Sequence, residues 1–531
     1  MSGEEPGSGS DATDAADVDS RGTDATDVDG RGAGAADVDS RGTDAADVVR
    51  RERFSGGPAR GFLSSLEADE RIFGADLAVD RAHVVMLAEQ GIVDEDSAGE
   101  ILAALDDVED AGHAALPDGE DVHAAIETAV VERVGDVGGR MHTARSRNDE
   151  VATCLRYRLR EDLLDAAERV LDLREVLAGV ADEHRETVMP GFTHLQPAQP
   201  TTVGHYLLSY ESSLRRDTER LLDAYDRTNR SPLGAAAFAG TTFDVDRERT
   251  AELLGFDGVV ENSMDAASAR DFLVESTAAL ASLATGLSGI AEDLVIFSNR
   301  GLVELDDDYA STSSIMPQKV NPDTMELVRA TAGDAAAGLN GLLTTLKGLP
   351  RAYNRDLQRA GPHAWDAVDA VVEAIEVAGG AVGTATWNED ALATAAGEGF
   401  STATGVADLL AQAGVPFRQA HEVVATAAAD SEQGTPGPAD IDAATETVLG
   451  ESLWTYLDED AVADALDPTA SVASRDSAGG PAPTATTAQL QAAQDQLDAV
   501  LNEIAARSAA LADAEETLIA AVETYREGDI A

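Results

Sequence analysis

The sequence has little positive charge and almost no lysine. Its 531 residues carry 99 acidic side chains against 38 basic ones, which gives a formal net charge of −61. Only Lys319 and Lys347 are lysines, so arginine supplies nearly all of the positive charge. A surface this acidic repels nucleic acids and anionic membranes, and we therefore expect no nucleic-acid or membrane partner.

Such an excess of one charge is tolerated best in concentrated salt. At about 1 M ionic strength the Debye length is about 3 Å, so repulsion between like charges becomes short-ranged. We interpret the composition as adaptation to a halophilic cytoplasm. The alternative is an unusually acidic interaction protein.

Cysteine and long apolar runs are also scarce. Cys154 is the only cysteine, which excludes a disulfide within the chain and fits a reducing compartment. No uninterrupted apolar run reaches transmembrane length, and the N-terminus lacks the basic segment and apolar stretch of a signal peptide. The sequence therefore predicts a cytoplasmic protein.

Strand-like alternation is lacking, and the first fifty residues lack large apolar side chains. We expect residues 1–52 to form a disordered acidic low-complexity tail. Beyond it, helix-favouring residues with apolar positions three and four apart predict helices over 151–186, 203–228, 266–299, 323–346 and 487–524. The expected fold is mainly α, with an N-terminal lobe (53–149), a long central helical bundle (150–395) and a C-terminal helical lobe (396–531).

Polar loops between the predicted helices are where chemistry is expected. Residues 311–323 combine neighbouring hydroxyl groups with Lys319, and such a loop could take up a proton and stabilise an oxyanion. The structural alternative is a Ser/Thr-rich helix N-cap with Lys319 in solvent.

Two further loops carry candidate functional groups. His194, in the proline-bounded segment 190–200, is a candidate acid or base near neutral pH, although a lone histidine is more often a capping or surface group. Arg145, Arg147 and Asn148 could grip carboxylates; alternatively, Ser146 or Asn148 simply caps a helix.

Taken together, the segments 146–149, 193–196 and 313–322 resemble sequence blocks of the fumarase/aspartase superfamily, most closely the argininosuccinate lyase family. The resemblance runs from about Arg53 to the C-terminus. It implies a three-domain fold and the elimination of argininosuccinate to arginine and fumarate without a metal or organic cofactor. It also implies a homotetramer whose active sites are shared between subunits.

The resemblance also implies roles for individual residues. Ser313 would be the base, Lys319 and Asn321 would stabilise the carbanion, and His194, oriented by Glu326, would protonate the leaving nitrogen or position the group that does. The implied substrate-binding residues are Ser146, Arg147, Asn148 and Thr193 for the succinyl part, Ser65, Asp69, Asp121, Tyr353 and Gln358 for the arginine end, and Arg270, which could order the loop.

The sequence departs from the family pattern at three places. Val320 stands where a second lysine is common, and Thr312 stands where glycine is common. Gly361 replaces a substrate-binding lysine, which leaves one carboxylate contact without a side chain. Arg351, Arg355 or Arg359 could substitute, because arginine binds carboxylates with two parallel hydrogen bonds.

Two other readings stay open. A sister lyase acting on adenylosuccinate, aspartate or fumarate/malate would share the fold, although Gln318 and the block 146–149 speak against it. The second is a non-enzymatic protein on the same scaffold. The joint presence of Ser313, Lys319, His194 and Glu326 speaks against it.

Overall fold

The computed structural model describes residues 58–431 and 435–526, and it is mainly helical, as predicted. The expected N-terminal tail lies outside the described residues. The N-terminal helices are α1 (Pro58–Leu63), α2 (Phe73–Glu89), α3 (Glu95–Ala111) and α4 (Val122–Val134). Short 3₁₀ helices span Ala68–Ile72, His113–Ala115, Gly135–His142, Asp307–Tyr309, Arg355–Arg359, Glu398–Phe400 and Leu453–Thr455.

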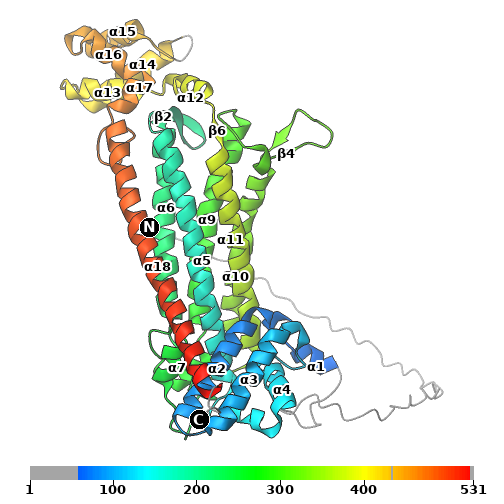
Figure 1. Cartoon of the computed structure of the whole chain (residues 1–531). Coiled ribbons are helices and arrows are strands. Elements are labelled where there is room, and N and C mark those ends of the chain that lie inside the picture. Colours follow the sequence, from blue (N-terminus) through cyan, green and yellow to red (C-terminus); the bar gives the residue numbers. More distant parts are fainter. Residues whose placement is uncertain (1–57, 432–434, 527–531) are drawn as a thin grey trace, which may run out of the picture. The chain divides into compact units, whose positions relative to one another are not determined.

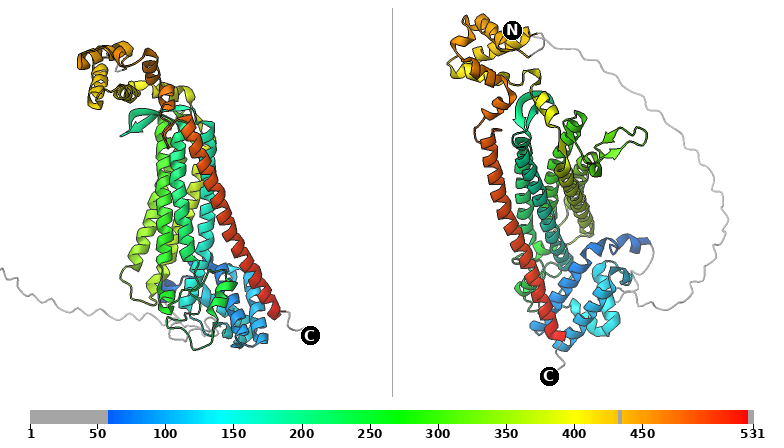
Figure 2. Two further views of the ribbon diagram at one scale, coloured as in Figure 1. Left: turned by 90° about the vertical axis from the view of Figure 1, so that its left-hand side faces the viewer. Right: turned by 45° about the horizontal axis from the view of Figure 1, so that its top comes forward.

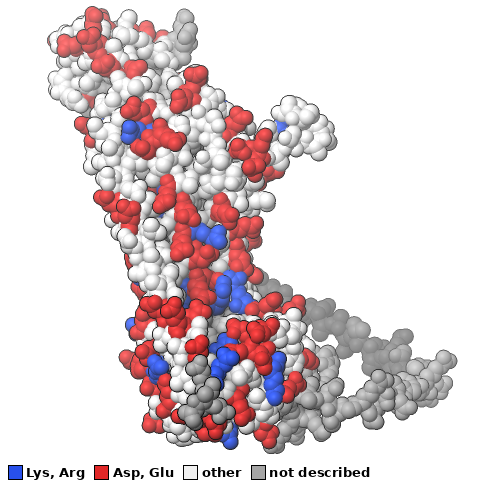
Figure 3. Space-filling model, viewed as in Figure 1, with Lys and Arg blue, Asp and Glu red and all other residues white. Residues whose placement is uncertain are grey.

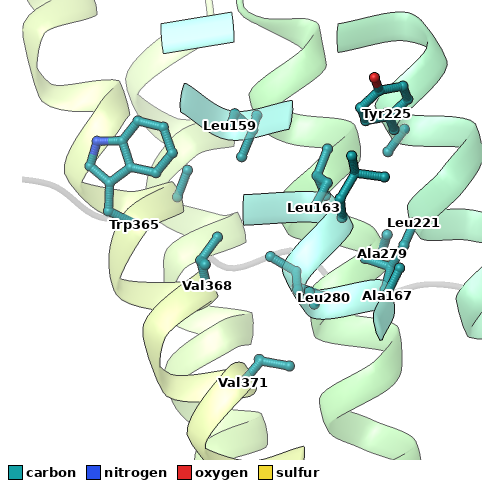
Figure 4. Packing of buried hydrophobic residues seen from close by; sticks show 14 of the residues in the cluster. Leu159, Leu163, Ala167, Leu221, Tyr225, Ala279, Leu280, Trp365, Val368 and Val371 are labelled. Carbon is teal, nitrogen blue, oxygen red and sulfur yellow. The ribbon is translucent and has the colours of Figure 1, made fainter. Parts of the chain in front are cut away.

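Five long helices form the central bundle: α5 (Arg147–Glu183), α6 (Val203–Thr228), α9 (Asp271–Asn299), α10 (Asp323–Leu346) and α11 (Ala360–Thr384). They lie side by side in every view (Figures 1 and 2). Apolar residues from α5, α9 and α11, among them Leu163, Leu280 and Val368, meet in its core (Figure 4). The three- and four-residue spacing of such positions turns them toward one face of each helix.

The predicted helices 203–228 and 323–346 agree with α6 and α10 at both ends. The predicted helix 266–299 is interrupted: α8 (Ser263–Ser268) ends at an extended Ala269, and α9 begins after Arg270. The buried guanidinium of Arg270 donates to the carbonyl oxygen of Ala269 at 2.7 Å. This local hydrogen bond and the extended backbone account for a break that periodicity does not reveal.

Helix α9 is apolar enough to resemble a membrane span. An 18-residue window has a mean hydropathy of 1.5, although no uninterrupted apolar run of that length occurs. The helix contacts α6, α10 and α11, so much of its apolar surface belongs to the bundle.

Two antiparallel hairpins project from one end of the bundle. The first consists of β1 (Val188–Thr193) and β2 (Gln196–Thr202), and the second of β4 (Ser311–Thr312) and β5 (Val320–Asn321); a further pair joins β3 (Val303–Glu304) to β6 (Thr386–Trp387). The sequence predicts a loop for the proline-bounded segment 190–200, whereas most of it forms the β1–β2 hairpin. A hairpin tolerates the prolines, since both of its strands are edge strands.

A second, smaller core lies in the C-terminal region. Its helices are α13 (Ala403–Gln412), α14 (Phe417–Asp430), α15 (Pro438–Leu449) and α16 (Glu459–Leu466). The preceding helix α12 (Glu389–Ala396) contacts β1 and β2 and adds Leu392 to the large core, and α17 (Pro468–Ala473) follows α16 and contacts it. Val406, Leu410 and Val423 are at its centre. Helix α18 (Pro483–Arg526) contacts α5 and α3 and adds Leu497 to the large core, as α7 (Arg247–Leu253) adds Leu253. The small core is thus narrower than the predicted lobe 396–531.

Acidic side chains are spread over the surface. On the face shown in Figure 3, Asp and Glu outnumber Lys and Arg over the bundle and over the helices at both ends of it. The loop between β4 and β5 differs, because Lys319 is the only charged residue between Ser311 and Pro322.

Candidate active site

A cavity of about 420 Å³ lies where α5 begins and α10 has ended. Five separate segments contribute to its walls, from the start of the described chain to the first turns of α11. Nine of the residues expected to bind substrate line it: Ser65, Asp69, Asp121, Ser146, Arg147, Asn148, Arg270, Tyr353 and Gln358.

One wall of the cavity carries two carboxylates. Asp69 accepts hydrogen bonds from the Ser65 hydroxyl at 2.7 Å and from the Val122 backbone N–H at 3.2 Å. Asp121 caps α4 by accepting the backbone N–H of Ala124 at 2.9 Å. Burial raises the pKa of Asp69. This effect outweighs the lowering of the pKa by the nearby positive charge of His123. This wall is suited to a cationic part of a ligand.

The opposite wall is the first turn of α5. The Ser146 side chain caps the helix, and its backbone N–H donates to Asp149 at 3.0 Å. Arg147 forms an ion pair with Asp121 at 2.8 Å, and the Asn148 side chain donates to the carbonyl oxygen of Ala237 at 3.0 Å. The capping role expected for this block is confirmed, and the same three residues line the cavity, so capping does not prevent the substrate-binding role that stays a prediction.

Arg270 and Tyr353 close the cavity toward α9. The Arg270 side chain is buried, and burial lowers its pKa to about 10. Burial also raises the pKa of Tyr353. The Gln358 amide donates to the carbonyl oxygen of Leu63 at 3.0 Å, which fixes the start of α11 against the N-terminal segment.

A cluster of buried charges lies beneath the cavity. His123 Nδ1 is 2.8 Å from Asp76, while Arg145 pairs with Asp80 at 2.5 Å and with Glu150 at 2.9 Å. Burial alone would lower the pKa of His123, but the charges of Asp76 and Glu150 outweigh it and raise the pKa to about 10. His123 is therefore an imidazolium at neutral pH. The cluster anchors α2, α4 and the start of α5 to one another.

Two groups within this cluster have the spacing of metal ligands: Asp76, His123 and Cys154, and Asp76, Asp80 and Glu150. The positive charges of His123 and Arg145 already face these carboxylates. The donor set therefore fits a buried ion-pair network, in which positively charged side chains already occupy the place beside these carboxylates.

His194 lies at the other end of the bundle, at the tip of the β1–β2 hairpin. His194 and Leu195 form a two-residue turn with φ values of 56° and 59°. Two successive left-handed residues are typical of a type I′ hairpin turn, and they are costly for side chains other than glycine. Thr193 and His194 are exposed on this strained tip.

Ser313 and Lys319 lie in the loop of the β4–β5 hairpin. The Ser313 hydroxyl oxygen accepts backbone N–H groups from Ile315 at 3.4 Å and from Met316 at 3.2 Å. Lys319 is exposed, and its ammonium donates to the Asn321 side chain. The loop thus aims two backbone donors at Ser313, which a sequence cannot reveal.

Glu326 lies in the first turn of α10 and is exposed. Among the described residues, no hydrogen bond or ion pair joins it to His194. The predicted orientation of His194 by Glu326 is therefore not formed within one chain.

The helices set the distance between the two groups of predicted residues. Helix α5 has 37 residues and rises about 1.5 Å per residue, so about 55 Å separates Arg147 from the hairpin that follows α5. Helix α10, with 24 residues, similarly separates Glu326 from Tyr353. One chain therefore brings nine predicted residues together around the cavity and holds Thr193, His194, Ser313, Lys319, Asn321 and Glu326 at the opposite end.

Several cavity residues were not predicted. Glu120, His123, His142 and Trp365 line it. Arg355, one of the three arginines that could substitute for the lysine missing at Gly361, lines it as well. His123 follows Asp121 by two residues and could have been found from that proximity. Trp365 carries no such signal, since an aromatic residue on an apolar helix usually belongs to the core.

Comparisons with known proteins show which family the chain is similar to. Residues 62–336 match the family described as Lyase, and residues 400–473 match the family described as Argininosuccinate lyase C-terminal. An argininosuccinate lyase of Natronomonas pharaonis is 72% identical over 90% of this chain and 96% of its own length. An argininosuccinate lyase of Haloarcula marismortui is 67% identical with the same coverage of both chains.

Solved structures agree as well. An EDDS lyase in complex with formate is 34% identical, has a TM-score of 0.81, and covers 89% of this chain and 96% of its own. A class II fumarase from Schistosoma mansoni, at 15% identity, shares the fold with a TM-score of 0.66 over 79% of this chain and 96% of its own.

Proposed function

The chain belongs to the argininosuccinate lyase family of the fumarase/aspartase superfamily, and from this premise we propose how its side chains divide the work. The reaction is the reversible elimination of argininosuccinate to arginine and fumarate, a step of arginine biosynthesis. One observation carries the proposal. The predicted binding residues line a cavity at one end of α5, whereas the predicted catalytic residues lie on two hairpins near its other end.

We propose that the active enzyme is a homotetramer in which hairpins of neighbouring subunits complete each cavity. The hairpin loop exposes apolar side chains, with 85% of Ile315 in solvent, and α10 exposes 71% of Leu327 and 51% of Leu343. In the apolar window of α9, only 44% of the residues are buried within the chain. Exposed apolar patches on this scale mark protein–protein interfaces. A second copy of this chain supplies both the cover and the missing catalytic groups.

Ser313 is proposed as the base. Its alkoxide removes the proton from the carbon beside a succinyl carboxylate, and the electron pair delocalises into that carboxylate as a dianion. An ordinary serine is too weak a base for this step. The N–H groups of Ile315 and Met316 support the role, because they stabilise a negative charge on the Ser313 oxygen. Lys319 and Asn321 stabilise the dianion.

The carbon–nitrogen bond then breaks, and the leaving guanidino nitrogen takes up a proton. His194 donates this proton or positions its donor, and Glu326 of an adjoining subunit orients the ring. The products are fumarate and arginine, so protons and electrons balance without an added redox partner. The chemistry assigned here uses side chains and backbone alone.

The cavity supplies the binding part of the reaction. Ser146, Arg147 and Asn148, together with Thr193 from another subunit, bind the succinyl carboxylates. Asp69 accepts hydrogen bonds from the cationic part of the arginine end. Burial raises the pKa of Asp69, and a positive charge of the ligand would offset that cost of burying the carboxylate. Arg270 holds the adjoining loop in place.

We propose that the enzyme works in the cytoplasm of a halophile. The net charge of −61 supports this proposal, since salt screens repulsion between exposed carboxylates. The single buried cysteine fits a reducing compartment.

The function is tested by adding argininosuccinate to the purified protein in multimolar KCl. Fumarate is followed by its ultraviolet absorbance, and arginine is quantified in parallel. We expect equal amounts of both products. If neither appears, adenylosuccinate, aspartate and malate are tested in the same buffer. Turnover of one of them would assign a sister activity and contradict the proposal, and turnover of none would leave an inactive scaffold.

A further inference from the structure

The cavity wall formed by the start of α11 contains a hydrogen-bond donor that the reaction scheme does not use. Gly361 and Trp365 are one turn apart on α11, and both line the cavity. A Cβ atom at position 361 would lie 3.3 Å from Nε1 of Trp365. The indole nitrogen therefore occupies the space beside the glycine that a longer side chain would enter.

The indole N–H faces the cavity without an acceptor. In the described part of the chain, Trp365 Nε1 forms no hydrogen bond, although only 7% of the residue is exposed. Its six-membered ring is turned toward Leu159, and the nitrogen lies on the side away from the labelled core residues (Figure 4). The Arg71 guanidinium stacks on the indole at 5.1 Å and fixes its plane.

The side chains that could substitute for a lysine at position 361 are already engaged. The amide of Gln358 donates to the Leu63 carbonyl oxygen, and Arg355 is ion-paired with Glu120. Arg351 lines a different cavity and pairs with Asp265 at 3.0 Å. Trp365 thus offers, beside Gly361, a donor without a partner among the described residues.

The position of this wall matches one end of the substrate. The Cβ position of Gly361 is 3.5 Å from Leu155, which is two turns beyond Arg147 on α5 and about 12 Å along its axis. Argininosuccinate carries carboxylates at both ends, joined through the guanidino group and three methylenes. If the succinyl end is at Arg147, the amino-acid end reaches Leu155.

We propose that Trp365, through its indole N–H beside Gly361, binds the α-carboxylate of the arginine part of the substrate. The indole is a donor only, so its ligand must be an acceptor, and carboxylates are the acceptors at the amino-acid end of this molecule. A larger side chain at position 361 would displace the nitrogen, so the glycine is a requirement of this contact. The inference rests on the proposed function, since it takes argininosuccinate as the ligand.

The test compares Trp365→Phe with the wild-type enzyme in both directions of the reaction. Phenylalanine keeps the ring and removes the N–H. We expect the KM for argininosuccinate and for arginine to rise about tenfold, because the lost hydrogen bond goes to a charged group. The KM for fumarate and kcat stay within about twofold, because the contact is equal in the ground and transition states. Trp454→Phe, at an exposed tryptophan of the C-terminal region, is the control and leaves all four values unchanged.

Agmatine, which is arginine without the α-carboxylate, separates binding from structure. If Trp365 contacts that carboxylate, wild type and Trp365→Phe use agmatine with fumarate equally well, however poorly. A merely structural role would weaken agmatine and arginine to the same degree and would overturn the proposal. Equal rises in the KM values for arginine and fumarate would overturn it as well.

Position 361 provides an independent variant. Gly361→Ala in the wild-type background pushes against the indole nitrogen and raises the KM for arginine, whereas in the Trp365→Phe background it adds nothing. Calorimetric titration with arginine reports the same loss without turnover. Unchanged arginine affinity in Trp365→Phe, with a loss in Arg355→Gln, would assign the carboxylate to Arg355 instead. Arginine that binds wild type without any turnover of argininosuccinate would contradict the proposed function while still testing this contact.

Discussion

The cavity and the two hairpins differ in how much of their geometry one chain provides. Around the cavity, Asp69, Arg147 and Asn148 are held by hydrogen bonds and ion pairs to other segments, above a buried charge cluster. At the hairpins, His194 and Lys319 are exposed, and His194 forms no hydrogen bond among the described residues.

This difference shows how the proposed chemistry is divided. A binding cavity benefits from rigid walls, which do not depend on assembly. The groups proposed to transfer protons lie on exposed loops, and in the proposed tetramer a neighbouring subunit would cover them, so that water exclusion would coincide with assembly. His194 and Leu195 at the hairpin tip have positive φ values, which strain the backbone. Such strain persists only where the surrounding structure holds the residues in place.

The largest effect is expected from removing Ser313, the proposed base. Ser313→Ala should lower kcat by about 1,000-fold or more, because a positioned general base contributes about 100- to 10,000-fold. Arginine affinity should be unchanged, because it depends on the cavity. Steady-state rates and calorimetry measure the two quantities. Ser314→Ala, next along the loop, is the control and keeps its activity; near-native turnover of Ser313→Ala would point to another base.

The next prediction tests whether the two regions meet between subunits. Arg147→Gln is expected to be inactive because it loses a carboxylate ligand, and Ser313→Ala because it loses the base. Mixed and reassembled subunits should regain activity at least about 100-fold above either variant, since some sites then combine an intact Arg147 with an intact Ser313. Activity is assayed before and after mixing, with each variant mixed with itself as the control. An active site formed within one chain would show no recovery.

Much of the bundle and the identity of the hairpin residues could be predicted from sequence. The ends of α6 and α10 follow from helical periodicity, and Ser313, His194 and Arg147 follow from the resemblance to the family. The predicted roles of individual residues remain predictions, because no ligand contact tests them.

The cavity's unpredicted residues depend on tertiary contacts. His123 becomes a buried imidazolium only because α2 brings Asp76 beside α4. Trp365 faces a cavity only because Leu63, Arg270 and the start of α5 close around α11. Neither contact leaves a periodic pattern in the sequence from which it could have been predicted.

A smaller effect is expected from salt, which should act on assembly before it acts on the cavity. Dilution from multimolar KCl to about 0.1 M lengthens the Debye length from about 3 Å or less to about 10 Å, so acidic surfaces brought together by assembly repel more strongly. We expect dissociation and about a tenfold or greater loss of activity, while monomers keep their helical circular dichroism. Light scattering and activity are measured on the same samples, with equal ionic strength of NaCl as the control. Full activity and unchanged mass would contradict the halophilic interpretation.

The smallest effect concerns the charge cluster beneath the cavity, and it appears as a pH dependence of stability. The pKa of His123 is raised from 6.5 to about 10, so its interaction with Asp76 contributes fully below pH 6.5 and is lost as the pH rises through about 10. The raised pKa of Asp80, about 7, acts mainly below neutrality, where the folded state holds a proton that the unfolded state has released. Between pH 7 and 10, the titration of His123 should therefore dominate the change in stability.

The free energy of unfolding of wild type should exceed that of Asp76→Asn most at pH 7. The difference between the two proteins should narrow by about 1–2 kcal/mol toward pH 10, at no more than about 1.4 kcal/mol per pH unit. Denaturant titrations in constant high salt measure both proteins, and a gap that stays constant would show that His123 is neutral in the folded state.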